Sequence, residues 1–118
     1  MNKAKKEEKI IPLIDVLTER TKNEKISWIH YEDDAYKTSF EDETIEFTYQ
    51  FKDYDDSDPD ASYILIFMNS SGVSYEAFYS VGNTSPGFRN FKSLYNAIIE
   101  AEEKNFLKRY DAFMAKEK

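Results

Sequence analysis

The densest group of ligand-type side chains in the sequence is a run of five aspartates within eight residues. It reads DYDDSDPD from position 53 to position 60. Asp56, Asp58 and Asp60 reproduce positions 1, 3 and 5 of an EF-hand calcium loop. The rest of that pattern is absent, because an alanine stands where glycine makes the sharp turn and a phenylalanine stands where glutamate closes the coordination shell. A calcium site of another kind at these three aspartates is one hypothesis, and a solvated turn rich in aspartate and proline is the other.

The negative charge of the chain is concentrated in one stretch. Residues 26–60 carry twelve acidic and two basic side chains, a balance of −10, whereas the whole chain of 118 residues has a formal charge of −7. Direct nucleic-acid binding is not expected, because neutralising phosphates requires a basic patch. An acidic field favours a basic partner, a cation or simple solubility.

The sequence predicts that acidic groups distant along the chain meet at one end of a sheet. Successive turns of an up-and-down antiparallel sheet lie at alternating ends, so the turn 32–34 and the segment 53–60 share one end, and the turn 41–43 lies at the other. We call the resulting set the acidic rim: Glu32, Asp33, Asp34, Asp53, Asp55, Asp56, Asp58 and Asp60. It could steer a basic protein surface or imitate the phosphate spacing of nucleic acid, and the plainer alternative is edge protection by charge.

Few residues in the chain are suited to catalysis. His30 is the only histidine, which excludes two-histidine zinc motifs but leaves a possible general base. The absence of cysteine excludes disulfides, thiolate metal sites and cysteine nucleophiles. None of the three glycines fits a nucleophile-elbow or phosphate-binding motif. We therefore expect a protein without enzymatic activity or cofactor, and a small carboxylate-dependent hydrolase using acidic residues and His30 is the weaker alternative.

The hydrophobic pattern predicts a single α+β domain over residues 10–118 after a charged tail over residues 1–9. Apolar residues at the helical period indicate a first helix, and Pro12 places its start near Ile11 because proline is tolerated in the first turn. Five strands are expected at about 26–31, 35–40, 44–52, 62–68 and 73–81. Short links between them indicate a five-stranded antiparallel meander with the terminal helices packed on one face. The continuously apolar strand 62–68 is expected to be central and covered on both faces.

A long helix is predicted from about residue 90 to residue 114, roughly 37 Å in length, which exceeds the ~30 Å span of a small domain. Its last turns, with Phe106, Tyr110 and Phe113, are therefore expected to overhang the sheet. They would pack on the first helix, bend back near Asn105, or meet a second subunit. Packing on the first helix is slightly favoured, and a dimer contact through the three aromatic residues is the alternative.

The sequence contains no apolar run near the ~20 residues that a membrane helix needs, and its first nine residues have no apolar core of a secretory signal. We expect a cytoplasmic protein that does not enter a membrane and is a monomer or a homodimer. The leading hypothesis is a small acidic interaction module, of the inhibitor or immunity type, that uses the acidic rim against a basic partner. The calcium-binding module is the alternative.

Overall fold

The computed structural model describes residues 3–40, 42–50, 62–81 and 87–117, and the structural statements below concern these residues. The elements in chain order are α1 (Lys3–Lys22), β1 (Ile29–Glu32), β2 (Ala35–Phe40), β3 (Glu43–Gln50), β4 (Ser62–Met68), β5 (Ser74–Val81) and α2 (Phe88–Lys116). The predicted α+β class is confirmed: in the sequence, one helix precedes the five strands of an antiparallel sheet and a long helix follows them.

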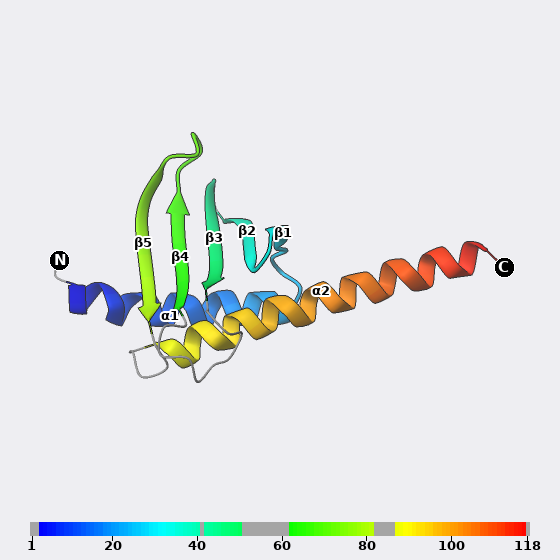
Figure 1. Cartoon of the computed structure of the whole chain (residues 1–118), viewed down its shortest axis with the longest axis horizontal. Helices are drawn as coiled ribbons and strands as arrows, with labels where there is room; N and C mark the ends of the chain where they lie inside the picture. Colours follow the sequence, from blue (N-terminus) through cyan, green and yellow to red (C-terminus); the bar gives the residue numbers. More distant parts are fainter. Residues whose placement is uncertain (1–2, 41, 51–61, 82–86, 118) are drawn as a thin grey trace.

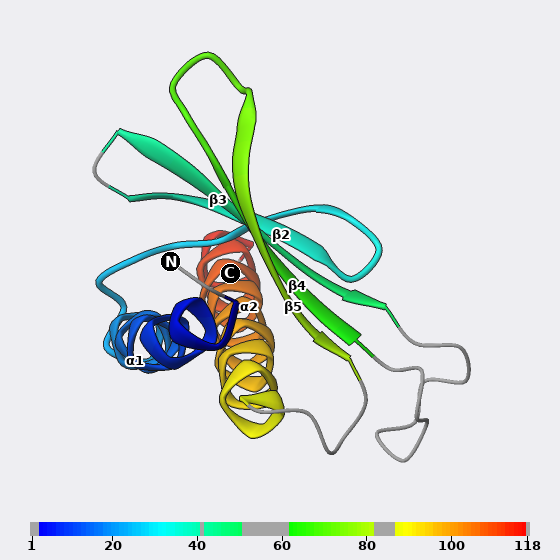
Figure 2. The ribbon, with the colours of Figure 1, turned by 90° about the vertical axis from the view of Figure 1, so that its left-hand side faces the viewer.

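The five strands form one antiparallel sheet in the order β1-β2-β3-β4-β5, so every strand pairs with its neighbour in sequence. Short turns make this order the simplest one, because antiparallel strands need no crossover connection. Both helices lie side by side on the same face of the sheet (Figure 2). The structure thus has two layers, and the helices approach the sheet from one side only.

Alternation of side chains along β3 selects the face that the helices cover. Ile45, Phe47 and Tyr49 are buried, whereas the intervening residues lie on the other face and are half-buried. The same alternation holds in β4, where Ile64 and Ile66 are only partly buried. β4 is an interior strand, since it pairs with β3 and with β5, but the expectation that it is covered on both faces is wrong. Among the described elements, both helices lie on the face that carries Leu65, and neither covers the face that carries Ile64 and Ile66.

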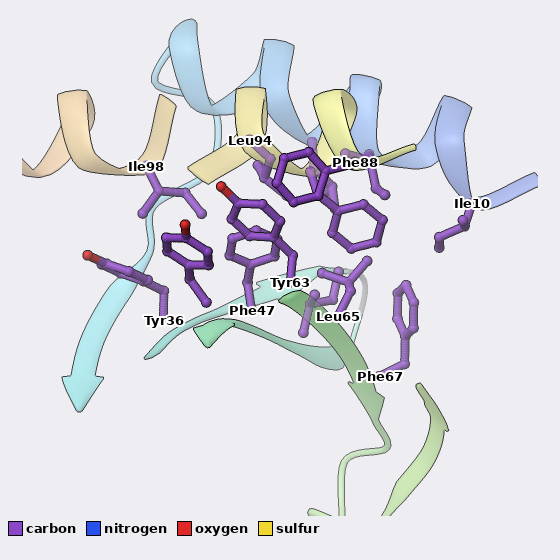
Figure 3. Packing of buried hydrophobic residues seen from close by; sticks show 14 residues of the cluster. Ile10, Tyr36, Phe47, Tyr63, Leu65, Phe67, Phe88, Leu94 and Ile98 are labelled. Atoms are coloured by element: carbon purple, nitrogen blue, oxygen red, sulfur yellow. The ribbon is translucent and has the colours of Figure 1, made fainter. Parts of the chain in front are cut away.

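Aromatic side chains fill most of the space between the sheet and the helices (Figure 3). Phe47 stacks on Tyr63 and on Phe91, with ring centroids 5.7 and 6.2 Å apart. Tyr63 in turn lies 5.3 Å from Phe88 in the first turn of α2. Each of these rings is less than 5% exposed. Burying large rings gives a small domain much of its stability, so this stack fixes α2 against β3 and β4.

The first helix begins earlier than the sequence predicts. α1 starts at Lys3, and Pro12 lies inside the helix rather than in its first turn. A proline inside a helix removes one backbone hydrogen bond, and Pro12 is exposed, so its ring does not disturb the packed face of the helix. The predicted apolar face is confirmed, because Ile14 and Leu17 are completely buried and Ile10 is 6% exposed.

The two helices run in the same direction along the sheet (Figure 1). The Asn90 side chain donates a hydrogen bond to Asp15 near the start of α2, and Lys108 pairs with Glu24 just beyond the end of α1. Because α1 ends where α2 is still continuing, it cannot cover the last turns of α2. The favoured packing of these turns on the first helix is wrong.

Candidate functional site

The described strand ends bring the turn between β1 and β2 next to the end of β3. Ala35 pairs with Thr48, and the backbone N–H of Tyr49 donates a hydrogen bond to the carbonyl of Asp34 at 2.9 Å. The next pair along the sheet is Gln50 with Ser62, so the chain leaves β3 and enters β4 at this same end. The turn after β1, the last residue of β3 and the first residue of β4 therefore lie at one end of the sheet, the end at which the acidic rim was predicted.

The described members of the acidic rim have two different environments. Glu32 and Asp33 are exposed. Asp34 is half-buried, and its carboxylate accepts a hydrogen bond of 2.8 Å from the hydroxyl of Tyr95 on α2. Asp34 thus joins the turn to the helix layer instead of pointing freely to solvent.

The remaining five members of the rim lie outside the described residues: Asp53, Asp55, Asp56, Asp58 and Asp60. Their part in the rim stays a prediction, as does the calcium hypothesis that depends on three of them. Over the part of the chain that the structure describes, no cluster of three or more histidine, aspartate or glutamate side chains is arranged to hold a metal ion.

Asp34 has a backbone conformation that few residues adopt. Its φ of 54° lies in the left-handed region, which aspartate tolerates better than most side chains because it hydrogen-bonds locally. The pairing of β1 with β2 is irregular next to it, between His30 and Glu32. An aspartate at this position therefore closes the hairpin and supplies the acceptor for Tyr95.

Two tyrosines behind this turn have raised phenol pKa values. Burial is the main cause for Tyr95, followed by its hydrogen bond to Asp34, since ionising the phenol would place two negative charges side by side. Burial also raises the pKa of Tyr36 to about 12, and the negative charges of Glu102 and Asp34 add to the shift. Both hydroxyls are therefore neutral at physiological pH and are poor proton acceptors.

His30 is held between the sheet and α2. Its ring stacks on Tyr36 with centroids 4.4 Å apart, and its Nδ1 lies 2.9 Å from a carboxylate oxygen of Glu102. Both members of the pair are well exposed, at 39% and 47%. The contact joins β1 to the middle of α2, where the helix begins to leave the sheet.

An open groove of about 930 Å³ lies beside this pair, between α2 and the segment that links α1 to β1. Its lining includes Trp28, whose indole N–H donates a hydrogen bond to the hydroxyl of Thr21, and Ile29, which is 60% exposed. The charged side chains around it are of both signs. The groove has an apolar wall and a histidine–carboxylate pair, but its shape and lining select no substrate.

The last third of α2 projects beyond the sheet and beyond α1 (Figure 1). Phe106, Tyr110 and Phe113, the three residues expected at a dimer contact, are 65%, 51% and 62% exposed. The helix continues unbroken through Asn105, so the alternative in which it bends back is also wrong. Of the three sequence-based expectations for this segment, a contact with a second subunit is the one that the described packing leaves open.

Within the described residues, no helix is both long enough and apolar enough to span a membrane.

Comparisons with protein-family models, with curated proteins and with solved structures each gave no match to this chain.

Sequence reasoning missed the two polar contacts that join the sheet to α2. The Asp34–Tyr95 pair connects positions 61 residues apart, and the His30–Glu102 pair connects positions 72 residues apart. Neither pair has a local signature, because the partners meet only after the helix has docked. The only available hint was that Tyr95 falls among the apolar residues at helical spacing in α2 and, as a tyrosine, needs a partner for its hydroxyl when it is buried.

Proposed function

We propose that this chain is a non-enzymatic protein-interaction module, of the inhibitor or immunity type, which presents the acidic rim to a basic partner protein in the cytoplasm. The observation that carries the proposal is the charge balance of −10 over residues 26–60, in a chain whose total is −7. The arrangement of strand ends supports it, because the turn after β1 and the exit from β3 lie at the same end of the sheet.

Such a rim acts mainly on the rate and specificity of association. Exposed charges attract a partner over roughly 10 Å at 0.1 M salt, and this attraction raises the encounter rate more than it lowers the final free energy of the complex. Glu32 and Asp33 are exposed and suited to this role. Asp34 is not, because its carboxylate is already engaged by Tyr95. The proposed contact surface therefore consists of the rim without Asp34.

The surroundings of His30 support a structural role for it. The ring is stacked on Tyr36 and hydrogen-bonded to Glu102, so both its face and one of its nitrogens are already used in joining β1 to α2. The Tyr36 hydroxyl beside it has a pKa of about 12 and is a poor nucleophile at neutral pH. These contacts favour an interaction module over a hydrolase.

The experiment is affinity capture from a lysate of the source cells with the tagged full chain, followed by identification of the retained proteins. We expect a basic protein that is retained at about 50 mM salt and released at a few hundred millimolar, because screening shortens the range of the rim. The triple variant Asp55→Asn, Asp56→Asn and Asp58→Asn, which removes three negative charges without changing side-chain size, should lose it.

A matched control removes three negative charges from another region. The variant Glu100→Gln, Glu103→Gln and Glu117→Gln has the same net charge as the test variant, but its changes lie on α2 and at the C-cap of that helix. It should retain the partner. Equal loss of the partner from both variants would show that only the net charge matters. Capture that is unchanged by salt and by the three aspartate substitutions would refute the rim as the contact.

A further inference from the structure

The projecting part of α2 carries a group of large apolar side chains that no described residue covers. We call this group the apolar stripe: Phe106, Leu107, Tyr110, Phe113 and Met114. Their exposed fractions range from 41% to 65%. The rings of Phe106 and Tyr110 stack with centroids 6.4 Å apart, so they form one continuous surface. Contiguous exposed apolar surface of this kind usually marks a contact with another molecule.

The apolar stripe lies on the part of α2 that runs past the body of the domain, which consists of the sheet and α1 (Figure 1). Its first members, Phe106 and Leu107, also line the open groove beside the body. Glu102 contacts His30 of β1 and Lys108 contacts Glu24 beyond α1, so the side of α2 between these two residues faces the body. At about 100° per residue, Phe113 follows Tyr95 by five full turns, so it points to the same side of α2 as a ring that packs on the sheet, but it lies beyond the sheet and is exposed. The side chains of the stripe are exposed because α2 continues past the described part of the body, and this leaves them open to an occupant from another molecule.

The spacing of the stripe is that of a helix which packs on another helix. Positions 106, 110 and 113 follow the alternating steps of four and three residues found at the seam of paired helices, and Leu107 and Met114 widen the seam by one position each. A face with this repeat is complementary to an identical face, because two equivalent ridges of side chains can interdigitate. A second copy of the chain supplies such a face.

The exposed area is sufficient for a pair of copies. A large aromatic side chain has roughly 200 Å² to bury, so three rings about 60% exposed and two half-exposed aliphatic side chains offer on the order of 600 Å² per copy. Two copies would bury about 1,200 Å² in total, which reaches the lower limit of standard specific interfaces and exceeds most crystal contacts.

The charges along this part of α2 also allow two copies to approach. Residues 100–117 carry five acidic and four basic side chains, a balance of −1. Two such segments side by side therefore repel each other little, in contrast to two copies of the stretch 26–60. A strongly acidic or strongly basic partner finds no matching field here, and a membrane surface would favour a basic polar face.

We propose that two copies of this chain pair through the apolar stripe, forming a homodimer in which the projecting ends of α2 pack against each other. The contact is separate from the acidic rim. Tyr95, which is bonded to the turn at Asp34, and Phe113 are 18 residues apart on one helix, which corresponds to about 27 Å. Dimerisation and partner capture can therefore succeed or fail independently.

The first test is the mass of the full chain in solution by light scattering after gel filtration. At about 100 µM we expect twice the chain mass of 13.9 kDa, since the fraction of dimer depends on the concentration of the chain. Phe113→Glu should weaken the dimer at least about 30-fold, because it replaces a buried ring of the seam with a charge. Ala112→Glu is the matched control, since it adds the same charge on the far side of the helix and should not change the mass.

The second test uses the absence of cysteine from the chain. Single variants Tyr110→Cys and Ala112→Cys are oxidised under mild conditions, and a disulfide-linked dimer is expected for the first and not for the second. A wild-type chain that is monomeric at 100 µM would overturn the proposal and would leave the stripe to another protein or a lipid surface. A dimer that Phe113→Glu does not weaken, or that Ala112→Glu weakens equally, would overturn it as well.

Discussion

The hydrogen bond between Tyr95 and Asp34 should contribute measurably to stability, and Tyr95→Phe removes it without changing the ring. The phenol donates to a carboxylate at 2.8 Å, and the bond joins α2 to the turn between β1 and β2. Hydrogen bonds to charged groups contribute about 1.5–3 kcal/mol. Because Asp34 is only half-buried, water can solvate its carboxylate in the variant, so we expect the lower end of this range.

A loss of about 1.5 kcal/mol corresponds to a fall in Tm of about 5 °C for a chain of this length. Urea denaturation followed by the fluorescence of the single tryptophan measures the loss directly, and it should appear as a lower midpoint with an unchanged slope. Asp34→Asn is the partner variant, since asparagine also tolerates the φ of 54° and keeps an acceptor oxygen. The two changes together should cost less than the sum of the single losses, with a coupling of about 1 kcal/mol.

The same bond predicts a dependence on alkaline pH. The folded-state pKa of Tyr95 lies above its ordinary value of 10.0, first through burial and then through the bond to Asp34. The stability linked to this group is therefore complete below pH 10 and is lost as the pH rises through the folded-state pKa. Tyr95→Phe should be less sensitive to pH above 10 than the wild type. Additive single losses, or identical alkaline curves, would refute the assigned role of the bond.

Three further outcomes are expected. Phe47→Ala should lower the free energy of unfolding by about 3–5 kcal/mol in urea, because the ring is completely buried in the aromatic core. Gly87→Ala should cost about 1–2 kcal/mol, measured as a lower Tm, since φ is 78° and the new Cβ would lie 3.1 Å from Ile11. Tyr36→Phe should remove a phenol that titrates near pH 12 in ultraviolet absorbance. The free energy of unfolding of this variant should fall less than that of the wild type between pH 10 and 12.

The strands could be predicted because their signal is local. In β3, alternate residues from Ile45 to Tyr49 are apolar, and a period of two leaves one choice of buried face. The sheet order followed from short links between neighbouring strands. The coverage of β4 could not be predicted, because a continuously apolar strand is compatible with cover on one face or on both. Ile64 and Ile66 are half-buried on the face away from the helices.

The start of α1 was missed because proline has two tolerated environments. A proline close to a helix start has no hydrogen bond to lose, and this made Ile11 the expected first residue. A proline on an exposed side of a longer helix loses one bond and disturbs nothing packed around it. Pro12 is of the second kind, and the charged residues from Lys3 onward show no apolar period that would have revealed the additional turns.

The candidate site was predicted least well where it depends on how α2 is oriented. The sequence shows apolar residues from Phe91 to Phe113 at roughly helical spacing, and this pattern alone indicates one face and one partner. The structure divides it into two: Phe91 and Ile98 pack on the sheet and α1, and from Phe106 onward the apolar residues are exposed on the projecting part of the helix. The division follows from the lengths of the two helices, since α1 has 20 residues and α2 has 29. At 1.5 Å per residue α2 is about 14 Å longer than α1, so α1 cannot cover all of α2 in either direction, and this difference in length leaves the chain a second surface to offer.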